Sequence, residues 1–250
     1  VINTNGARWQ GNVVGNNNAI FNDQGSIWNG DVLANGGGSN DLTLIDNFGA
    51  WGGAVQSNFA SIYNDAGSWS GDVISNGGGA MFAEIDNSAL WTGKVTSNGG
   101  GIFNEAGATW LGEVVSNGVG GNYAEIDNYG AWAGDVDTNA SWIYNLGGTW
   151  TGKVLGNTGY LYNNFIDSNS NPGGINHAIW NGDIIGNSGR IVNETGGFWN
   201  GDVKSNAGTI TNLGIWTGSF TSAGTVKAEN RINGAFTNNG LLQLTGSLAG

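Results

Sequence analysis

The chain has 250 residues, of which 19 are acidic and seven basic, so its formal net charge is −12 at pH 7. This balance argues against nucleic acid and anionic membrane surfaces as partners, because both require clustered Lys and Arg. The absence of Cys excludes disulfides and thiolate metal sites, and a single His leaves little material for a zinc site or a nucleophile–base pair.

The composition favours an ordered β structure. Glycine makes up 48 of the 250 residues, which would ordinarily favour disorder, but 39% of the residues are hydrophobic and recur in strict register. No window keeps the 3.6-residue apolar spacing of a helix, and no apolar run approaches the ~20 residues of a membrane helix. We therefore expect no membrane insertion by this segment and one elongated domain over residues 1–250.

The predicted elements alternate along the chain between two kinds of short run. In the first kind, Gly stands two residues after Trp, Val or a related apolar residue stands four after, and Asn stands seven after. The Trp residues of these runs are Trp9, Trp28, Trp51, Trp69, Trp91, Trp110, Trp132, Trp150, Trp180, Trp199 and Trp216. The Asn residues are Asn16, Asn35, Asn58, Asn76, Asn98, Asn117, Asn139, Asn157, Asn187 and Asn206, with Ala223 as the exception; a worn copy follows at Ile232, Gly234, Phe236 and Asn239.

The second kind of run is I-x-N, and we place its first copy at Ile2. The later copies are Ile20/Asn22, Ile45/Asn47, Ile62/Asn64, Ile85/Asn87, Ile102/Asn104, Ile126/Asn128, Ile143/Asn145, Leu161/Asn163, Ile191/Asn193 and Ile210/Asn212. The mean spacing between successive Trp residues, from Trp9 to Trp216, is about 21 residues, which is typical of solenoid repeats. Short and long spacings alternate, which indicates that a two-coil unit was duplicated.

A repeat of this length predicts an all-β parallel β-helix of about 12 coils with roughly 20 residues per coil. Strands this short bury their apolar faces only against the next coil, so equivalent residues form columns. Asn tolerates bends and can hydrogen-bond from coil to coil, and the Gly after each Trp is expected to leave room for the indole. A β-propeller would need a doubled unit of about 41 residues with four strands and is the weaker alternative.

Alternating aromatic and acidic residues mark one outward column. One residue after each Ile, the column reads Phe21, Asp46, Tyr63, Asp86 and Phe103, which we call the mixed ladder. Its functional interpretation is a lateral contact surface or a platform for sugars. The alternative is a surface left by duplication, in which the aromatic side chains cover one another.

Four aromatic residues cluster farther along the chain. By strand parity Trp142, Tyr144, Tyr160 and Tyr162 point outward on neighbouring coils, and we call these four residues the aromatic platform. Nearby in the coil order are two carboxylates that would complete a ligand site, together with an inserted loop at 164–178 that lengthens one repeat. The carboxylates are Glu125 and Asp127, and the loop holds Pro172 and His177.

Catalytic chemistry is not predicted. Asp46, Asp86, Asp127 and Asp167 recur because the repeat recurs, and no carboxylate pair stands out with basic residues beside it. The run "GGGSND" at 36–41 departs from the calcium-binding nonapeptide at its fourth position and has no tandem copy. We therefore expect a non-enzymatic protein with no cofactor and no metal site.

Three stretches, "TWTGKVLGNTGYLYN", "FWNGDVKSNAGTITNLGIWTG" and "NGAFTNNGLLQLTG", resemble passenger domains of bacterial autotransporters and related hemagglutinin-like surface proteins. The resemblance covers nearly the whole chain and rests on the style of the repeat. It implies a right-handed parallel β-helix, export through the outer membrane to the cell surface or medium, and an adhesive or scaffolding role. The chain would then be a segment of a longer surface protein.

Two functions are consistent with these observations. The first is a surface stalk or adhesin whose partners are glycans or proteins on host or bacterial surfaces. The second is a subunit that stacks end to end into a structural filament. A β-helix protein that binds or degrades polysaccharide is a third and weaker alternative.

Overall fold

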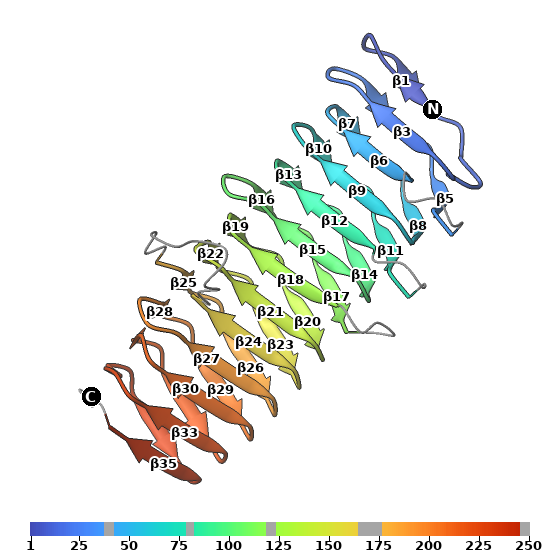
Figure 1. Cartoon of the computed structure of the whole chain (residues 1–250). Coiled ribbons are helices and arrows are strands. Elements are labelled where there is room, and N and C mark those ends of the chain that lie inside the picture. The colour runs from blue at the N-terminus through green and yellow to red at the C-terminus, as the bar shows by residue number, and fades with distance from the viewer. Residues whose placement is uncertain (38–42, 79–82, 119–123, 165–176, 246–250) are drawn as a thin grey trace. The chain divides into compact units, whose positions relative to one another are not determined.

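The computed structural model describes residues 1–37, 43–78, 83–118, 124–164 and 177–245. Within these ranges the chain forms short strands joined by turns, and the strands pair in parallel with strands of the neighbouring turns (Figure 1). The fold is an all-β parallel β-solenoid of about 11 turns, which confirms the predicted fold class. The described residues contain no helix of the length and hydropathy that a membrane span requires. Contacts divide the chain into two units, residues 1–126 and 127–250, each described by itself below.

Each turn contributes strands to three sheets, which we name by their inward residues as the Ile, Trp and Val sheets. In the first unit the Ile sheet has the order β1 (Ile2–Asn3), β3 (Ala19–Asn22), β6 (Leu44–Asn47), β9 (Ser61–Asn64), β12 (Glu84–Asn87) and β15 (Gly101–Asn104). The Trp sheet contains β2 (Arg8–Trp9), β4 (Ile27–Trp28), β7 (Ala50–Trp51), β10 (Ser68–Trp69), β13 (Leu90–Trp91) and β16 (Thr109–Trp110). The Val sheet contains β5 (Val32–Asn35), β8 (Val55–Asn58), β11 (Val73–Asn76), β14 (Val95–Asn98) and β17 (Val114–Asn117).

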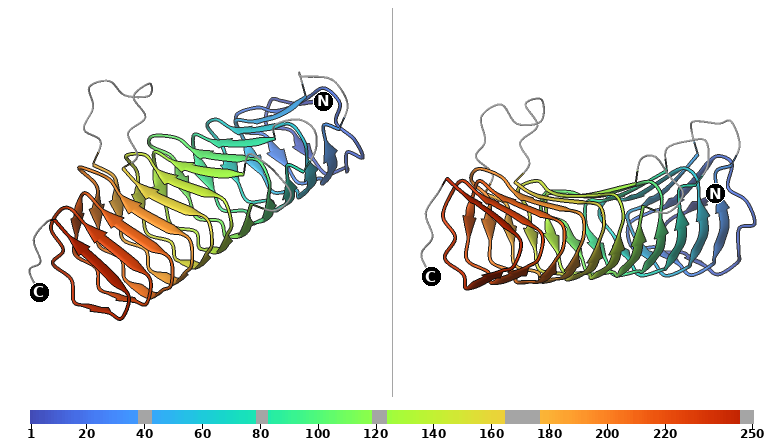
Figure 2. Two further views of the ribbon diagram at one scale, coloured as in Figure 1. Left: turned by 60° about the horizontal axis from the view of Figure 1, so that its bottom comes forward. Right: turned by 90° about the horizontal axis from the view of Figure 1, so that it is seen from below.

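The second unit repeats this arrangement (Figure 2), and β18 (Glu125–Asn128) contains the boundary between the units. Its Ile sheet contains β21 (Trp142–Asn145), β24 (Tyr160–Asn163), β27 (Arg190–Asn193), β30 (Thr209–Asn212), β33 (Thr225–Ala228) and β35 (Leu241–Leu244). Its Trp sheet contains β19 (Ala131–Trp132), β22 (Thr149–Trp150), β25 (Ile179–Trp180), β28 (Phe198–Trp199) and β31 (Ile215–Trp216). Its Val sheet contains β20 (Val136–Asn139), β23 (Val154–Asn157), β26 (Ile184–Asn187), β29 (Val203–Asn206), β32 (Phe220–Ser222) and β34 (Phe236–Asn238).

The interior of each unit is built from columns of identical or similar side chains. Alternation along each strand buries Ile20, Trp28 and Val32 completely, and the equivalent positions of the following turns are also buried as far as Val226. In the last turn the equivalent Phe236 and Leu242 are half-buried. Successive turns therefore stack identical or similar side chains on one another, and β-branched side chains pack well in such a pleated stack.

Indoles fill the core in two continuous stacks, one in each unit. In the first unit, ring centroids from Trp9 to Trp110 are 4.6–5.0 Å apart with interplanar angles of 4–10°. In the second unit, from Trp132 to Trp216, they are 4.7–4.8 Å apart. From Trp28 onward every indole in the stacks is at most 1% exposed, and its Nε1 donates to the carbonyl of the Gly two residues later at 2.7–3.0 Å. Each buried N–H is thereby satisfied within its own turn.

Two ladders of buried Asn line the corners of each unit. Along each ladder the Nδ2 of one Asn donates to the Oδ1 of the next, as from Asn47 to Asn64 and from Asn64 to Asn87, both at 2.8 Å. The same Nδ2 also donates to a backbone carbonyl, for example Asn64 to Leu90 at 3.0 Å. Because a buried amide without partners is costly, these bonds explain why Asn recurs at fixed positions.

The recurring Gly has a different cause from the one predicted. A Cβ on Gly53 would lie 1.9 Å from the carbonyl oxygen of Gly30, one turn earlier, and Gly71 stands in the same relation to Gly53. The obstacle is thus the backbone of the preceding turn. The indole is only a secondary contact, since Trp9 lies 3.2 Å from a Cβ on Gly30.

Two predicted registers were wrong by one residue. At the start, Ile2 was expected to point inward, but β1 pairs Ile2 with Phe21 and Asn3 with Asn22. The ladder therefore begins at Asn3, directly after Ile2, which is 68% exposed. Near the other end, a register irregularity between β29 and β32 pairs Asn206 with Ser222. The Ser222 hydroxyl accepts from Asn206 Nδ2 at 2.9 Å, so the ladder continues through Ser222 and not through Ala223.

Candidate functional site

The aromatic platform lies on the outer face of the Ile sheet in the second unit. Strands β21 and β24 pair Trp142 with Tyr160 and Tyr144 with Tyr162. The residues between them, Ile143 and Leu161, are fully buried in the core, so parity directs the four rings outward. The outward orientation of the rings thus follows from the inward columns.

The four rings contact one another as a two-by-two array. Trp142 lies 6.4 Å from both Tyr144 and Tyr160, measured between ring centroids. Tyr162 lies 5.3 Å from Tyr144 and 6.3 Å from Tyr160, with both pairs stacked. Trp142 is 39% exposed and Tyr160 is 42% exposed, whereas Tyr144 and Tyr162 are half-buried. The array is an apolar surface with phenol hydroxyls and an indole N–H among its polar groups.

A guanidinium group borders this array. Strand β27 pairs Arg190 with Tyr160, and the Arg190 Cζ lies 6.0 Å from the centroid of the Tyr162 ring. This distance is within the range of a cation–π contact, which holds the charge at the edge of the aromatic surface. The repeat makes Leu161 and Ile191 consecutive copies and so places Arg190 next to Tyr160, but the contact of the guanidinium with Tyr162 depends on the conformation of its long side chain.

The two carboxylates predicted beside the platform fall in different units. Glu125 belongs to residues 1–126, and Asp127 opens the second unit. Burial raises the pKa of Glu125 above its usual value. The site that the structure assembles within the second unit therefore consists of the four rings and Arg190. Asp127 on β18 belongs to the same unit, whereas Glu125 does not.

The predicted insertion at 164–178 lies mostly outside the described residues, since 165–176 are not among them. Its two ends are anchored to each other and to the next turn. Asn164 donates through Nδ2 to the carbonyl of Thr195 at 2.7 Å and accepts from the backbone N–H of Ala178 at 3.1 Å. His177 contacts the edge of Phe198 at 5.4 Å between centroids. The anchoring keeps β24 and β27 adjacent although the insertion separates them in sequence.

The mixed ladder lies in the first unit as one register row. Strands β3, β6, β9, β12 and β15 pair its members in the order Phe21, Asp46, Tyr63, Asp86 and Phe103. All five are half-buried, because each side chain stands against its neighbours on the adjacent strands. Aromatic rings and carboxylates thus alternate across five strands.

Burial in this row alters the acidity of its carboxyls. Burial first, and then the charges of nearby carboxylates, raises the pKa of Asp46 and of Asp86 from 3.8 to about 6. One carboxylate oxygen of each is buried and has no hydrogen-bond partner among the described residues. Glu84, by contrast, accepts from Ser61 Oγ at 2.7 Å and from the Tyr63 hydroxyl at 2.6 Å. Asp46 and Asp86 are therefore carboxyls that take up a proton near pH 6.

The acidic residues three positions after Trp act mainly on the backbone. Asp72 accepts the N–H of Lys94 at 2.9 Å, and Asp135 accepts the N–H of Lys153 at 2.7 Å. Of the ion pairs that alternating charges in this column would predict, the described residues form one, between Lys94 and Glu113 at 3.8 Å. These carboxylates therefore tie one turn to the next, which accounts for part of the acidic composition.

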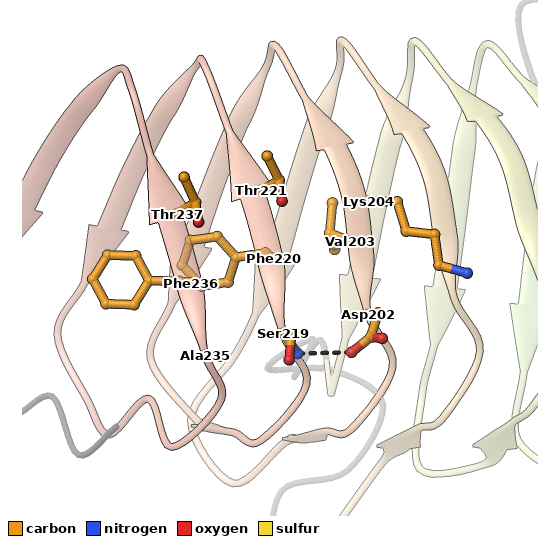
Figure 3. Close-up of a pocket in the computed structure, with 9 residues that line it drawn as sticks. All are labelled: Asp202, Val203, Lys204, Ser219, Phe220, Thr221, Ala235, Phe236 and Thr237. Carbon is orange, nitrogen blue, oxygen red and sulfur yellow. Dashed lines mark hydrogen bonds between the residues drawn. The ribbon is translucent and has the colours of Figure 1, made fainter.

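A hollow lies on the Val sheet of the second unit between β29, β32 and β34 (Figure 3). Here phenyl rings replace the Val column, and Phe220 and Phe236 stack at 5.2 Å. Charged groups beside it are already engaged: Asp202 accepts the backbone N–H of Ser219 at 2.8 Å, and Lys204 pairs with Asp183 at 2.9 Å. The hollow lies where the core side chains change: Phe220 and Phe236 follow the Val column, and Ile232 follows Trp216 in the Trp column.

Among the described residues, no three His, Asp or Glu side chains gather in a way that could hold a metal ion. Comparisons of the chain with protein-family models, with curated proteins and with solved structures give no match.

Proposed function

We propose that this chain is a non-enzymatic β-solenoid scaffold that binds carbohydrate on its aromatic platform. The observation that carries the proposal is the two-by-two array of Trp142, Tyr144, Tyr160 and Tyr162 on the open face of a sheet. Two of the four rings are exposed on the side of the sheet that does not form the core, and a contiguous aromatic patch in that position is typical of a binding surface.

Sugars fit this chemistry better than an apolar protein segment does. One face of a pyranose ring is lined by C–H groups and packs flat on an aromatic ring, while its hydroxyls project sideways. A phenol hydroxyl on the exposed part of the platform, as on Tyr160, can donate to and accept from these hydroxyls. The platform residues thus supply stacking and hydrogen bonds, which are binding groups, and we infer recognition without bond cleavage.

The scaffold suits a site that needs rigidity but no closure. Trp142 and Tyr160 stand on strands whose inward residues are fixed by the Ile column and by the Asn ladder. Such support lowers the entropy cost of holding the rings ready for a ligand. Together with the resemblance to autotransporter passengers, this supports a stalk or adhesin at a bacterial cell surface or in the medium.

A glycan array followed by calorimetry tests the proposal. Wild-type protein is expected to bind a subset of oligosaccharides, and the double variant Trp142→Ala with Tyr160→Ala is expected to lose that binding. The matched control replaces Phe21 and Phe103 of the mixed ladder by Ser, which removes aromatic surface from the Ile sheet of the other unit. Binding that is lost in the control and kept in the platform variant would overturn the proposal. Sedimentation of the same samples shows whether self-association, the alternative function, occurs instead.

A further inference from the structure

The outer face of the Ile sheet continues from the platform into a row of basic and hydroxyl side chains. Beyond β24, strand β27 presents Arg190, and β30 presents Thr209 in register with it. Strand β33 then presents Thr225 and Lys227. A path across these strands therefore runs from rings to a guanidinium, to hydroxyls and to an ammonium group.

The basic residues on this path are unusual in so acidic a chain. The sequence holds seven Lys and Arg against 19 Asp and Glu, and two of the seven, Arg190 and Lys227, share this one face. On the corresponding face of the first unit, the mixed ladder carries carboxylates at Asp46 and Asp86 instead. The strands beyond β24 are thus basic at these two positions, whereas Asp127 on β18, on the other side of the platform, carries a carboxylate.

The guanidinium is available to a ligand. Arg190 is exposed, and the contact of its side chain among the described residues is with the ring of Tyr162. Burial raises the pKa of Glu194 above its usual value, and the positive charge of Arg190 offsets part of this rise. The two do not form an ion pair within the described part of the chain, so an incoming acid group could pair with the guanidinium.

The spacing along the path matches an extended sugar chain. Neighbouring strands lie about 4.8 Å apart, so Arg190 and Lys227 are about 10 Å apart across the sheet. Lys227 is also shifted by two residues, or about 7 Å, along the strand, because it lies in the register row of Thr211 and not in that of Thr209. One pyranose unit is close in length to one strand spacing, and in an extended chain every second unit turns its acid group to the same side. A sugar chain that crosses the strands obliquely would therefore bring acid groups on alternate sugars to the two cations.

We propose that the platform binds an acidic polysaccharide that crosses the strands of the Ile sheet. Its sugar rings stack on Trp142 and Tyr160, and its acid groups pair with Arg190 and Lys227. This inference rests on the proposed function and narrows it to anionic glycans. Carboxylated and sulfated chains share the required chemistry, and the test separates them.

The test measures affinity for three probes by calorimetry: oligogalacturonate, the same oligomer fully methyl-esterified, and an oligomer of dextran sulfate. In wild-type protein the acidic probes are expected to bind more tightly than the ester, with affinity that falls as salt rises. Arg190→Gln is expected to weaken acidic binding by about tenfold or more and to leave binding of the ester unchanged. Whichever acidic probe loses more affinity in Arg190→Gln identifies the acid group.

The controls keep the two proposals apart. Arg8→Gln removes the same charge from the Trp sheet of the first unit and is expected to change nothing, and Trp142→Ala is expected to weaken all three probes. If the ester binds as tightly as the acid and Arg190→Gln has no effect, the anionic inference fails while carbohydrate binding stands. If no probe or array glycan binds wild-type protein, or if Trp142→Ala leaves all binding intact, the proposed function fails with it.

Discussion

The contact between the backbones of successive turns can be tested by a single pair of adjacent substitutions. A Cβ on Gly53 would lie 1.9 Å from the Gly30 carbonyl oxygen, whereas ordinary contact begins at 3.4 Å. The two turns would have to move apart by the difference between these distances, because packed atoms do not interpenetrate. Such a movement breaks the neighbouring backbone bonds from Gly52 N to Trp28 O at 2.7 Å and from Val32 N to Ala54 O at 2.8 Å.

The magnitude follows from these two bonds. Each buried pair left without partners costs about 1–3 kcal/mol, so Gly53→Ala should lower the free energy of unfolding by roughly 2–6 kcal/mol. Gly52 is the matched control, because it is exposed and its nearest neighbour is the Asn29 side chain at 3.2 Å. Gly52→Ala should change stability by less than about 1 kcal/mol, since it mainly restricts the unfolded chain.

Urea unfolding followed by circular dichroism measures both variants. The urea concentration at the unfolding midpoint should fall clearly for Gly53→Ala and hardly change for Gly52→Ala. Equal midpoints for the two variants would refute the close approach of the turns and the stated reason for the recurring Gly.

Three further predictions concern the ladders and the indole stack. Asn64→Leu should cost roughly 2–4 kcal/mol in urea unfolding, because Asn47, Asn87 and the Leu90 carbonyl each lose one hydrogen bond, and the exposed Asn29→Leu should cost little; similar costs would argue against the ladder. The raised pKa of Asp46 means that the folded state binds a proton more tightly than the unfolded state, so this group's contribution to stability should grow as pH falls from about 6 toward 3.8. Asp46→Asn should therefore change the dependence of the melting temperature on pH in this window, and an unchanged slope would contradict the shift. Parallel indoles at 4.6–5.0 Å should lower the near-ultraviolet absorption of each Trp through stacking; Trp69→Phe should weaken this effect and Trp142→Phe should leave it, and equal effects would contradict the stack.

The repeat was enough to predict the solenoid and the direction of most side chains. A period of two fixes which residues of "WNGDV" share a face, and burial of Trp28, Gly30 and Val32 follows from that parity. Registers were predicted less well at the two ends. In the first turn Val1 and not Ile2 stands at the position equivalent to Ile20, since Val replaces Ile in the motif. Near the other end, Phe220 and Ser222 are one residue closer in sequence than Val203 and Asn206, which shifts the column without changing the motif.

The candidate site was predictable only in part. The outward rings of Trp142 and Tyr160 followed from parity, because their neighbours in the strand belong to a column. The contact of Arg190 with Tyr162 did not, because it depends on the conformation of a long side chain and not on the repeat. The raised pKa values of Asp46 and Asp86 also escaped prediction, because they depend on burial between rings that only the structure reveals.

The central claim is that the interior indoles stabilise the fold by packing in the core, while the exposed rings of the aromatic platform bind the ligand. Mild oxidation of Trp with peptide mass spectrometry tests both halves at once. Trp142 is 39% exposed and ten interior indoles are at most 1% exposed, so Trp142 should be oxidised well before those ten, and saturating acidic oligosaccharide should protect it. Early oxidation of Trp69 or Trp91, or oxidation of Trp142 that bound oligosaccharide does not slow, would contradict the account.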